Sequence, residues 1–209
     1  EAGIVLQQGF GMSEAAPSIA ILSKDLALEK AGSIGRPLFH VDARVVDGDM
    51  NDLPAGVEGE LVIRGPNLMQ GYWNRPDATK EAFDGGWFHT GDIARMDADG
   101  DLYIVDRKKD MFISGGENVY PAEVENAIFE LPQVAETAVI GIKDEKWGEV
   151  GRAIVVLKEG EQLGRAEVID FLKGRLAKYK VPKQVIFIDR LPRNAAGKVL
   201  KNILREKYS

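Results

Sequence analysis

The feature that most constrains the fold is a change of hydrophobic pattern at the charged segment "DRKKD" (106–110). Before it, alternating apolar runs such as "GELVIRGP" (59–66) predict strands separated by turns that are rich in Gly and Pro. After it, strand-like runs alternate with segments whose apolar residues recur at helical spacing. Because linkers between domains are exposed and polar, we predict a boundary at 106–110, with a β-rich part over 1–106 and a small α+β domain over 107–209.

The second part has the pattern of helices that cover a sheet. In "YPAEVENAIFEL" (120–131), Pro121 stands at a helix start, and the apolar residues that follow lie on one face. "RAEVIDFLKGRLAKY" (165–179) has the same spacing, and the closing segment also predicts a helix. The predicted strands are "ETAVIGI" (136–142), "GRAIVVLKEG" (151–160) and "QVIFID" (184–189). The predicted fold class is therefore α+β.

Composition excludes several classes of function. The chain has 209 residues, 44% hydrophobic and 29% charged, which is typical of a soluble globular protein. A net charge of −6 gives no electrostatic footprint for nucleic acid, and it leaves at most a peripheral association with membranes. The absence of Cys excludes a thiol nucleophile and a Cys-ligated zinc site, and His40 and His89 are too few for a His-rich metal site.

The apolar runs are too short to span a membrane, and no signal segment opens the chain, so we expect a cytoplasmic protein. The start, "EAGIVLQQGFGMSE" (1–14), lacks a Met and enters strand-like sequence at once. We therefore expect an interior piece of a longer protein, with a mature or tag-cleaved terminus as the alternative. The sequence does not indicate an oligomeric state.

Two motifs in the first part have the residues to bind a nucleotide. "GFGMSEAAP" (9–17) is a tight Gly turn with the Ser13 hydroxyl beside the Glu14 carboxylate. Backbone amides in such a turn can face a phosphate, and the carboxylate can hold Mg²⁺. "GWFHTGDIA" (86–94) carries Asp92, whose carboxylate on a tight loop can accept hydrogen bonds from both hydroxyls of a ribose. The alternatives are a solvated Ser-Glu pair and an Asx turn that caps itself.

Two further motifs lie in the second part. "ISGGENVYPAEVE" (113–125) places paired glycines before a helix, where they permit the close approach of a ligand, and a plain loop is the alternative. "RNAAGKVLK" (193–201) contains Gly-Lys but is not a Walker A loop. Its leading Gly is absent, and Val199 stands where the magnesium-binding Ser or Thr should be. On its own, Lys198 has the pattern of a solvated lysine at a helix start.

Taken in order, these motifs resemble the adenylate-forming superfamily of acyl- and aryl-CoA synthetases, luciferases and peptide-synthetase adenylation domains. The order "GFGMSE", "GELVIRGPNLMQGYWNRPDAT", "GWFHTGDIA", "DRKKDMFISGGENVYPAEVE" and "LPRNAAGK" is similar to that of the family and spans essentially the whole chain. With "DEKWGE" (144–149), the pattern is most similar to bacterial fatty-acyl-CoA and aryl-CoA ligases, which are AMP-dependent. The resemblance implies that this chain is the C-terminal portion of such an enzyme.

The resemblance implies an acid–thiol ligase with two half-reactions. A carboxylic acid, with a fatty acid as the expected class, attacks the α-phosphate of ATP to give an acyl-adenylate and pyrophosphate, and coenzyme A then displaces AMP. Glu14 matches the Mg²⁺-binding glutamate, and Asp92 and Arg107 match the ribose contacts. Lys198 matches the mobile lysine that bridges the carboxylate and the α-phosphate. The other matches in the nucleotide site are Phe10 against adenine, Gly11, Met12 and Ser13.

The resemblance also implies domain alternation. It makes 1–106 the β-barrel-like end of a large AMP-binding domain, and 107–209 a small mobile domain that rotates about a hinge at Lys109. Rotation would withdraw Lys198 and bring in the "SGGEN" loop, where Gly116 leaves room for the pantetheine arm of CoA.

Trp147 and Tyr179 match positions that aryl-CoA ligases use for the CoA nucleotide, and Lys183 could meet its phosphates. Core packing is the alternative for Trp147 and Tyr179. "DEKWGE" with Tyr179 favours free CoA as the acceptor over a carrier protein.

The chain departs from the family pattern at two positions: Asp106 precedes Arg107 where Gly is usual, and Ser13 replaces Thr. The family's phosphate loop and most of its acyl pocket precede "GFGMSE" and are absent, so we expect the isolated fragment to be inactive. The alternatives that stay open are an aryl-CoA ligase for cinnamate or benzoate, a carrier-protein-loading adenylation domain, a luciferase-like oxidative enzyme, and a non-catalytic binding module.

Overall fold

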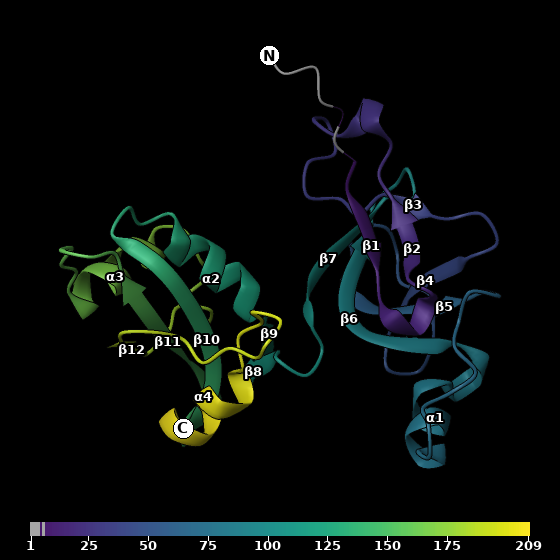
Figure 1. Cartoon of the computed structure of the whole chain (residues 1–209). Coiled ribbons are helices and arrows are strands. Elements are labelled where there is room, and N and C mark those ends of the chain that lie inside the picture. The colour runs from purple at the N-terminus through teal and green to yellow at the C-terminus, as the bar shows by residue number, and fades with distance from the viewer. Residues whose placement is uncertain (1–4, 6) are drawn as a thin grey trace. The chain divides into compact units, whose positions relative to one another are not determined.

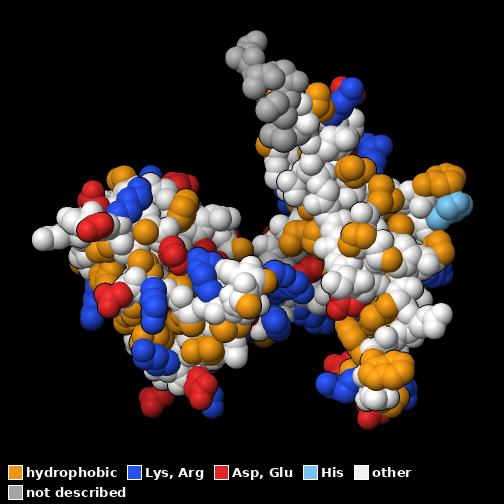
Figure 2. Space-filling view, in the orientation of Figure 1, with side chains coloured by type: hydrophobic (Ala, Val, Ile, Leu, Met, Phe, Trp, Pro, Cys, Tyr) orange, Lys and Arg blue, Asp and Glu red, His pale blue; other side chains and the backbone are white. Residues whose placement is uncertain are grey.

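The structure is a computed structural model that describes residue 5 and residues 7–209. The chain divides into two compact units, Glu1–Lys108 and Lys109–Ser209, and the division falls inside the charged segment 106–110 (Figure 1). Each unit contains its own sheets and buried core and is described by itself. Figure 2 shows charged side chains of both signs interspersed over the surface of each unit.

The first unit contains two antiparallel sheets, of order β1-β2-β3 and β4-β5-β6-β7. The strands are β1 (Gly9–Gly11), β2 (Ser18–Ile21), β3 (Arg36–Pro37), β4 (Asp42–Val46), β5 (Gly59–Arg64), β6 (Phe88–Met96) and β7 (Leu102–Arg107). The helix is α1 (Pro76–Ala82), and the 3-10 turns are Ser13–Ala15, Lys24–Leu26 and Asp84–Gly86.

Strand β5 lies in the core of the first unit. Leu61, Val62 and Ile63 follow one another and are all fully buried. Because successive side chains of a strand point to opposite faces, both faces of β5 are covered. This explains why its sequence is a continuous apolar run.

Two features of the first unit differ from the sequence expectation. The Thr-Gly-Asp motif predicts Asp92 on a tight loop, but β6 continues through the motif to Met96. The pairing register with β7 shifts between Ile93 and Ala94, and such a bulge bends a strand without ending it. The hydrophobic pattern also misses α1, because none of its seven residues is buried and it has no apolar face to detect.

The second unit is an α+β domain, and the predicted fold class is confirmed. Its sheet has the order β10-β11-β8-β9, and β12 pairs in parallel with β11. The strands are β8 (Phe112–Ser114), β9 (Glu117–Val119), β10 (Val134–Asp144), β11 (Gly148–Leu157) and β12 (Gln184–Phe187). The helices are α2 (Pro121–Phe129), α3 (Arg165–Lys173) and α4 (Lys201–Tyr208).

Helices cover both faces of this sheet. Val139 and Val155 belong to a buried cluster with α2 and α3, whereas Ile140 and Ile154 belong to a second cluster with Leu204 of α4. Since side chains alternate along a strand, α2 and α3 pack on one face and α4 on the other.

The helix predicted over 165–179 is shorter in the structure. It ends at Lys173, with Gly174 at the C-cap, and Leu176 packs on the core from the turn that follows. Glycine in a helix interior is unfavourable, which accounts for the early end. In the described part of the chain, every helix is too short or too polar to cross a lipid bilayer.

Candidate functional site

The candidate phosphate and metal site lies on the 3-10 turn Ser13–Ala15, directly after β1. The turn is tight, because a Cβ on Gly11 would lie 1.9 Å from the carbonyl oxygen of Pro17. The Met12 N–H donates to the same carbonyl at 2.7 Å. Only glycine fits at position 11, so the sequence expectation of a tight Gly turn is explained by close backbone approach.

The other residues of this motif differ in exposure. Phe10 is half-buried and packs against the core of the first unit, whereas the Ser13 hydroxyl is on an exposed residue. Phe10 can therefore offer part of its ring to a planar base, while Ser13 can reach a ligand in solvent.

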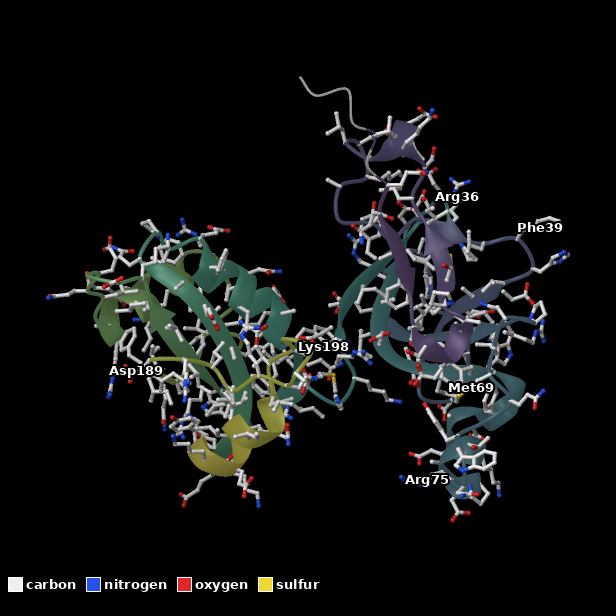
Figure 3. All side chains as sticks on the ribbon, viewed as in Figure 1. Arg36, Phe39, Met69, Arg75, Asp189 and Lys198 are labelled. Carbon is white, nitrogen blue, oxygen red and sulfur yellow. The ribbon has the colours of Figure 1, made fainter. Side chains whose placement is uncertain are left out.

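Glu14 is half-buried, and two contacts from a distant segment hold it. The Met69 N–H donates to the Glu14 carbonyl at 2.7 Å, and the Tyr72 hydroxyl donates to Glu14 Oε1 at 3.1 Å; Met69 is labelled in Figure 3. Burial, and then the hydrogen bond to the Glu14 carboxylate, raises the pKa of Tyr72. Within the described residues no lysine or arginine pairs with Glu14, so no ion pair competes with a hard cation such as Mg²⁺ for its carboxylate oxygens.

Asp92 and Arg107 lie opposite each other on β6 and β7. Arg107 Nε is 2.9 Å from Asp92 Oδ1; the Asp92 side chain is only 4% exposed and that of Arg107 is 50% exposed. The Thr90 hydroxyl donates to the Leu61 carbonyl and accepts from the Asp92 N–H at 3.1 Å, which fixes the backbone at the aspartate. The two residues that the resemblance assigns to the ribose therefore form one ion pair.

A neighbouring cluster was not predicted from the sequence. Glu60 of β5 is nearly buried, and its Oε2 lies 3.0 Å from His89 Nδ1 and 2.9 Å from Lys108 Nζ. Burial alone would raise the pKa of Glu60, but the hydrogen bonds from Lys108 and His89 lower it below its ordinary value. An acidic residue inside the apolar run "GELVIRG" is the signal that could have found this cluster.

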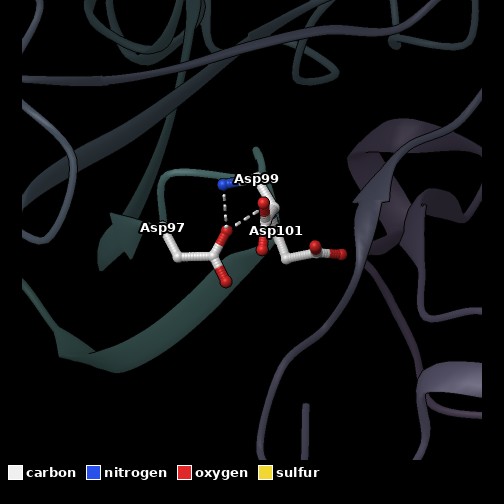
Figure 4. Close-up of side chains that lie close together, drawn as sticks. All are labelled: Asp97, Asp99 and Asp101. Atoms are coloured by element: carbon white, nitrogen blue, oxygen red, sulfur yellow. Dashed lines mark hydrogen bonds between the residues drawn. The ribbon is translucent and has the colours of Figure 1, made fainter. Parts of the chain in front are cut away.

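An acidic turn between β6 and β7 has the residues of a cation site. Asp97, Asp99 and Asp101 lie together, and the Asp97 carboxylate accepts backbone N–H groups from both others (Figure 4). The ammonium of Lys30 lies 2.7 Å from Asp97 and 2.6 Å from Asp99. Because a lysine already supplies the cation, we assign no metal to this turn.

The second unit begins at Lys109, the predicted hinge, which is exposed. The next residue, Asp110, forms an ion pair with Arg205 of α4 at 2.8 Å. The start of the unit is therefore bonded to the helix that follows the Lys198 turn.

Lys198 lies on a turn that is ordered by Asn194 (Figure 3). Asn194 Oδ1 accepts the N–H groups of Ala196 and Lys198 at 3.0 and 2.9 Å, and Arg193 forms an isolated bridge with Val199. Lys198 is exposed, and within the described residues no carboxylate pairs with its ammonium. Helix α4 begins three positions later, at Lys201, so Lys198 belongs to a turn rather than to the helix start.

The candidate CoA residues of the second unit fall into two places. Gly115 and Gly116 form the turn between β8 and β9, and the Gly115 N–H donates to the Trp147 carbonyl at 2.9 Å. The Trp147 side chain lies against Gly115 and is 37% exposed, and Lys183 Nζ lies 6.0 Å from its ring centroid. Tyr179 is half-buried and packs against the core beside α3.

The structure therefore brings together Asp92 with Arg107, and Trp147 with Lys183 and the glycine turn. Glu14 lies in the first unit and Lys198 in the second. Sequence reasoning did not find Tyr72, which contacts Glu14, or the Glu60–Lys108 pair, whose lysine directly follows Arg107.

Comparison with protein families gives two matches. The family described as "AMP-binding enzyme" matches residues 1–73, and "AMP-binding enzyme C-terminal domain" matches residues 123–198. Among curated relatives, a feruloyl-CoA synthase from Amycolatopsis is 50% identical over 206 residues, which are 99% of this chain and 42% of that protein. The long-chain-fatty-acid–CoA ligase FadD13 of Mycobacterium tuberculosis is also 50% identical, over 99% of this chain and 41% of its own.

Solved structures with the same fold include two ligand complexes. The o-succinylbenzoate CoA synthetase MenE of Bacillus subtilis, bound to its acyl-adenylate intermediate, has a TM-score of 0.91 and 43% identity over 97% of this chain and 41% of that one. ATP-bound MatB from Rhodopseudomonas palustris has a TM-score of 0.91 and 42% identity over 100% of this chain and 41% of its own. The chain thus spans about two-fifths of the length of these proteins.

Proposed function

This chain belongs to the AMP-binding enzyme family, and from that premise we propose that it is the C-terminal portion of an AMP-forming acyl-CoA ligase. The reaction joins a carboxylic acid to coenzyme A in two steps, through an acyl-adenylate, and consumes ATP. In this proposal 1–106 ends the large AMP-binding domain and 107–209 is the mobile C-terminal domain, with its hinge at Lys109.

The proposal rests mainly on how the structure holds Lys198. Its backbone is fixed by Asn194, while its ammonium has no carboxylate partner in the described part of the chain. A cation held on an ordered turn can bridge the acid substrate and the α-phosphate of ATP. Charge accumulates on the phosphate oxygens in the transition state, so a positioned ammonium stabilises that state most.

Asp92 and Arg107 would orient the nucleotide. The buried carboxylate of Asp92 would accept hydrogen bonds from the ribose hydroxyls, and its ion pair with Arg107 would hold it in one orientation. Arg107 is half exposed and retains further N–H donors for the ribose. Phe10 would lie against adenine, with Ser13 and the backbone of Gly11 and Met12 near the phosphates.

Glu14 fits a magnesium ion that accompanies ATP. Its carboxylate is an oxygen ligand on a fixed turn, and it carries no ion pair within the described residues. When bound, Mg²⁺ neutralises the charge of the phosphates. Glu14 would hold the nucleotide through that ion, and the tight Gly11 turn would keep the carboxylate in place.

The second half-reaction needs a site for coenzyme A. Trp147 offers an exposed indole face beside Lys183, and this combination suits an adenine ring and its phosphates. Gly116 would leave room for the pantetheine arm, and Tyr179 would support the nucleotide from the side of the core. Rotation at Lys109 would exchange Lys198 for this site, which is a domain movement of the hinge type.

We propose a fatty acid as the acid substrate, and an aromatic acid is the second candidate. The relatives favour neither, because one is named for a long-chain fatty acid and others for ferulate and 2-succinylbenzoate. Their names as CoA ligases favour coenzyme A over a carrier protein as the acceptor. We expect the 209-residue piece alone to be inactive.

The test measures ATP–pyrophosphate exchange by the full-length protein that contains this chain, across a panel of fatty and aromatic acids. Lys198→Ala is expected to slow exchange about 100-fold or more, by analogy with the loss of one transition-state donor. It should retain thioester formation from a supplied acyl-adenylate, since that step uses the other conformation. Lys207→Ala removes an exposed lysine of α4 and should change neither step. Equal loss of both steps in Lys198→Ala would contradict the proposal.

A further inference from the structure

The segment 67–72 contacts the Glu14 turn at several points. Asn67 Nδ2 donates to the carbonyls of Ala15 and Ser18 at 3.1 and 2.9 Å, and the Met69 N–H donates to the Glu14 carbonyl at 2.7 Å. These hydrogen bonds satisfy backbone carbonyls within the turn and just after it, so they fix the backbone conformation of the turn. The segment belongs to the motif "GELVIRGPNLMQGYWNRPDAT", for which neither half-reaction above provides a role.

Tyr72 extends this contact to the side chain of Glu14. Its hydroxyl donates to Glu14 Oε1 at 3.1 Å, across 58 positions of sequence. Its own N–H donates to the Thr79 hydroxyl at 2.9 Å, and that hydroxyl donates to the Arg75 carbonyl at the start of α1. The backbone of Tyr72 is therefore fixed by α1, while its phenol reaches the carboxylate.

We propose that Tyr72 is a positioning residue for Glu14, holding one carboxylate oxygen so that the other is presented to the magnesium ion of bound ATP. The inference rests on the proposed role of Glu14. A neutral hydroxyl suits this task, because it occupies one of about four acceptor positions on the carboxylate without neutralising its charge. A lysine in the same place would instead compete with the metal.

The preorganisation has a measurable consequence. A free glutamate side chain must lose its rotamer freedom when it binds a metal, whereas one held by Tyr72 has already lost most of it. Removing the hydroxyl should therefore raise the Mg²⁺ concentration that nucleotide binding requires, without disturbing the binding of AMP in the absence of metal. This separates positioning of Glu14 from general damage to the fold.

The test uses the full-length protein and an ATP analogue with a methylene group between the α- and β-phosphates, which cannot be cleaved there. Calorimetry at a series of free Mg²⁺ concentrations gives the concentration for half-maximal binding. For Tyr72→Phe we expect this concentration to rise about three- to tenfold, the effect of losing one hydrogen bond of ordinary net strength. Tyr103→Phe is the matched control, since its hydroxyl lies 3.4 Å from the Asp97 carboxylate, and it should leave the value unchanged.

The binding of AMP in the presence of a chelator shows whether each variant is folded, and Tyr72→Phe should match the wild type there. An unchanged or lower Mg²⁺ requirement in Tyr72→Phe would overturn the inference, because the hydroxyl would then be neutral to the metal or compete with it. Glu14→Gln separates this failure from that of the proposed function. If Glu14→Gln leaves the Mg²⁺ dependence intact, the metal role of Glu14 is wrong and the inference falls with it.

Discussion

At the scale of single residues, burial decides which charges depend on a partner. The Asp92 carboxylate is almost fully buried, whereas its partner Arg107 keeps half of its side chain in solvent. Removing a carboxylate from water is costly unless it is paired and hydrogen-bonded. The Arg107 guanidinium therefore compensates the buried carboxylate and still has N–H groups in solvent, where they can donate to a ligand.

The ion pair between Lys30 and Asp97 gives a prediction about pH. The hydrogen bond from Lys30 lowers the pKa of Asp97 from 3.8 to about 2 in the folded chain. A carboxylate whose pKa is lower in the folded than in the unfolded chain stabilises the fold at pH values above its pKa in the unfolded chain. This stabilisation is lost as the pH falls through its pKa in the folded chain. The free energy of unfolding of Lys30→Met should therefore differ from that of the wild type most above about pH 4, and the difference should shrink towards about pH 2.

Urea unfolding at a series of pH values measures this difference. Lys173→Met is the matched control, since Lys173 lies at the same 2.7 Å from a carboxylate, that of Asp170, but on an exposed helix face. Exposed pairs stabilise weakly, so its difference from the wild type should be smaller throughout. A Lys30→Met difference that stayed constant down to about pH 2 would show that the pair does not act through Asp97.

Individual site residues could be named from the sequence only where a family motif carries them. Asp92, Arg107 and Lys198 stand in such motifs. The Tyr72–Glu14 bond and the Glu60–Lys108 pair join residues 58 and 48 positions apart. No local pattern predicts contacts of that range, because they depend on strand pairing and on the turn that returns the chain.

At the scale of elements, the β8–β9 turn sets the position of Trp147. A Cβ on Gly115 would lie 2.7 Å from Trp147 Cε3, whereas nothing lies within 4 Å of a Cβ on Gly116. Both glycines have positive φ, of 64° and 90°. Gly116→Ala should therefore cost about 1 kcal/mol of backbone strain. Gly115→Ala adds displacement of the indole and should cost about 2–3 kcal/mol.

Urea unfolding followed by circular dichroism measures both costs. The difference in near-ultraviolet indole signal between each variant and the wild type reports on Trp147, because Trp73 and Trp87 lie in the other unit. We expect that signal to change in Gly115→Ala and to keep its wild-type form in Gly116→Ala. Equal destabilisation of the two variants with an unchanged indole signal would mean that the packing of Trp147 on Gly115 does not matter.

Helices and strands could be predicted from the sequence where apolar residues recur at regular spacing. The strands β10, β11 and β12 and helix α2 lie where their patterns predict them, because each buries a defined face. Elements that the pattern predicted wrongly lack such a signal. Helix α1 buries no side chain, and α3 ends early at a glycine although the residues on both sides of it continue the helical spacing. The bend in β6 depends on its pairing with β7, which the sequence of β6 alone does not contain.

At the scale of the whole molecule, the two units have separate cores. The buried cluster of the first unit includes β5 and β6, and the two clusters of the second unit lie on opposite faces of its own sheet. The charged segment 106–110 was the sequence signal for this division, since it interrupts the apolar pattern. The sequence does not reveal that Lys108, the last residue of the first unit, forms an ion pair with Glu60 of β5.

The separate core predicts that residues 109–209 fold alone. A domain of this length can bury enough apolar surface for independent stability, and helices cover both faces of its sheet. Expressed by itself, it should unfold in urea in one cooperative transition, which the fluorescence of Trp147 can follow because it is the one tryptophan of this segment.

Leu172→Ala removes a fully buried side chain and should lower the free energy of unfolding of this domain by about 2–5 kcal/mol. Ile203→Ala, at a partly exposed position of α4, should cost about 1 kcal/mol or less. A gradual transition that neither substitution shifts would mean that this core forms only together with the first unit, and the proposed movement about Lys109 would then lose its physical basis.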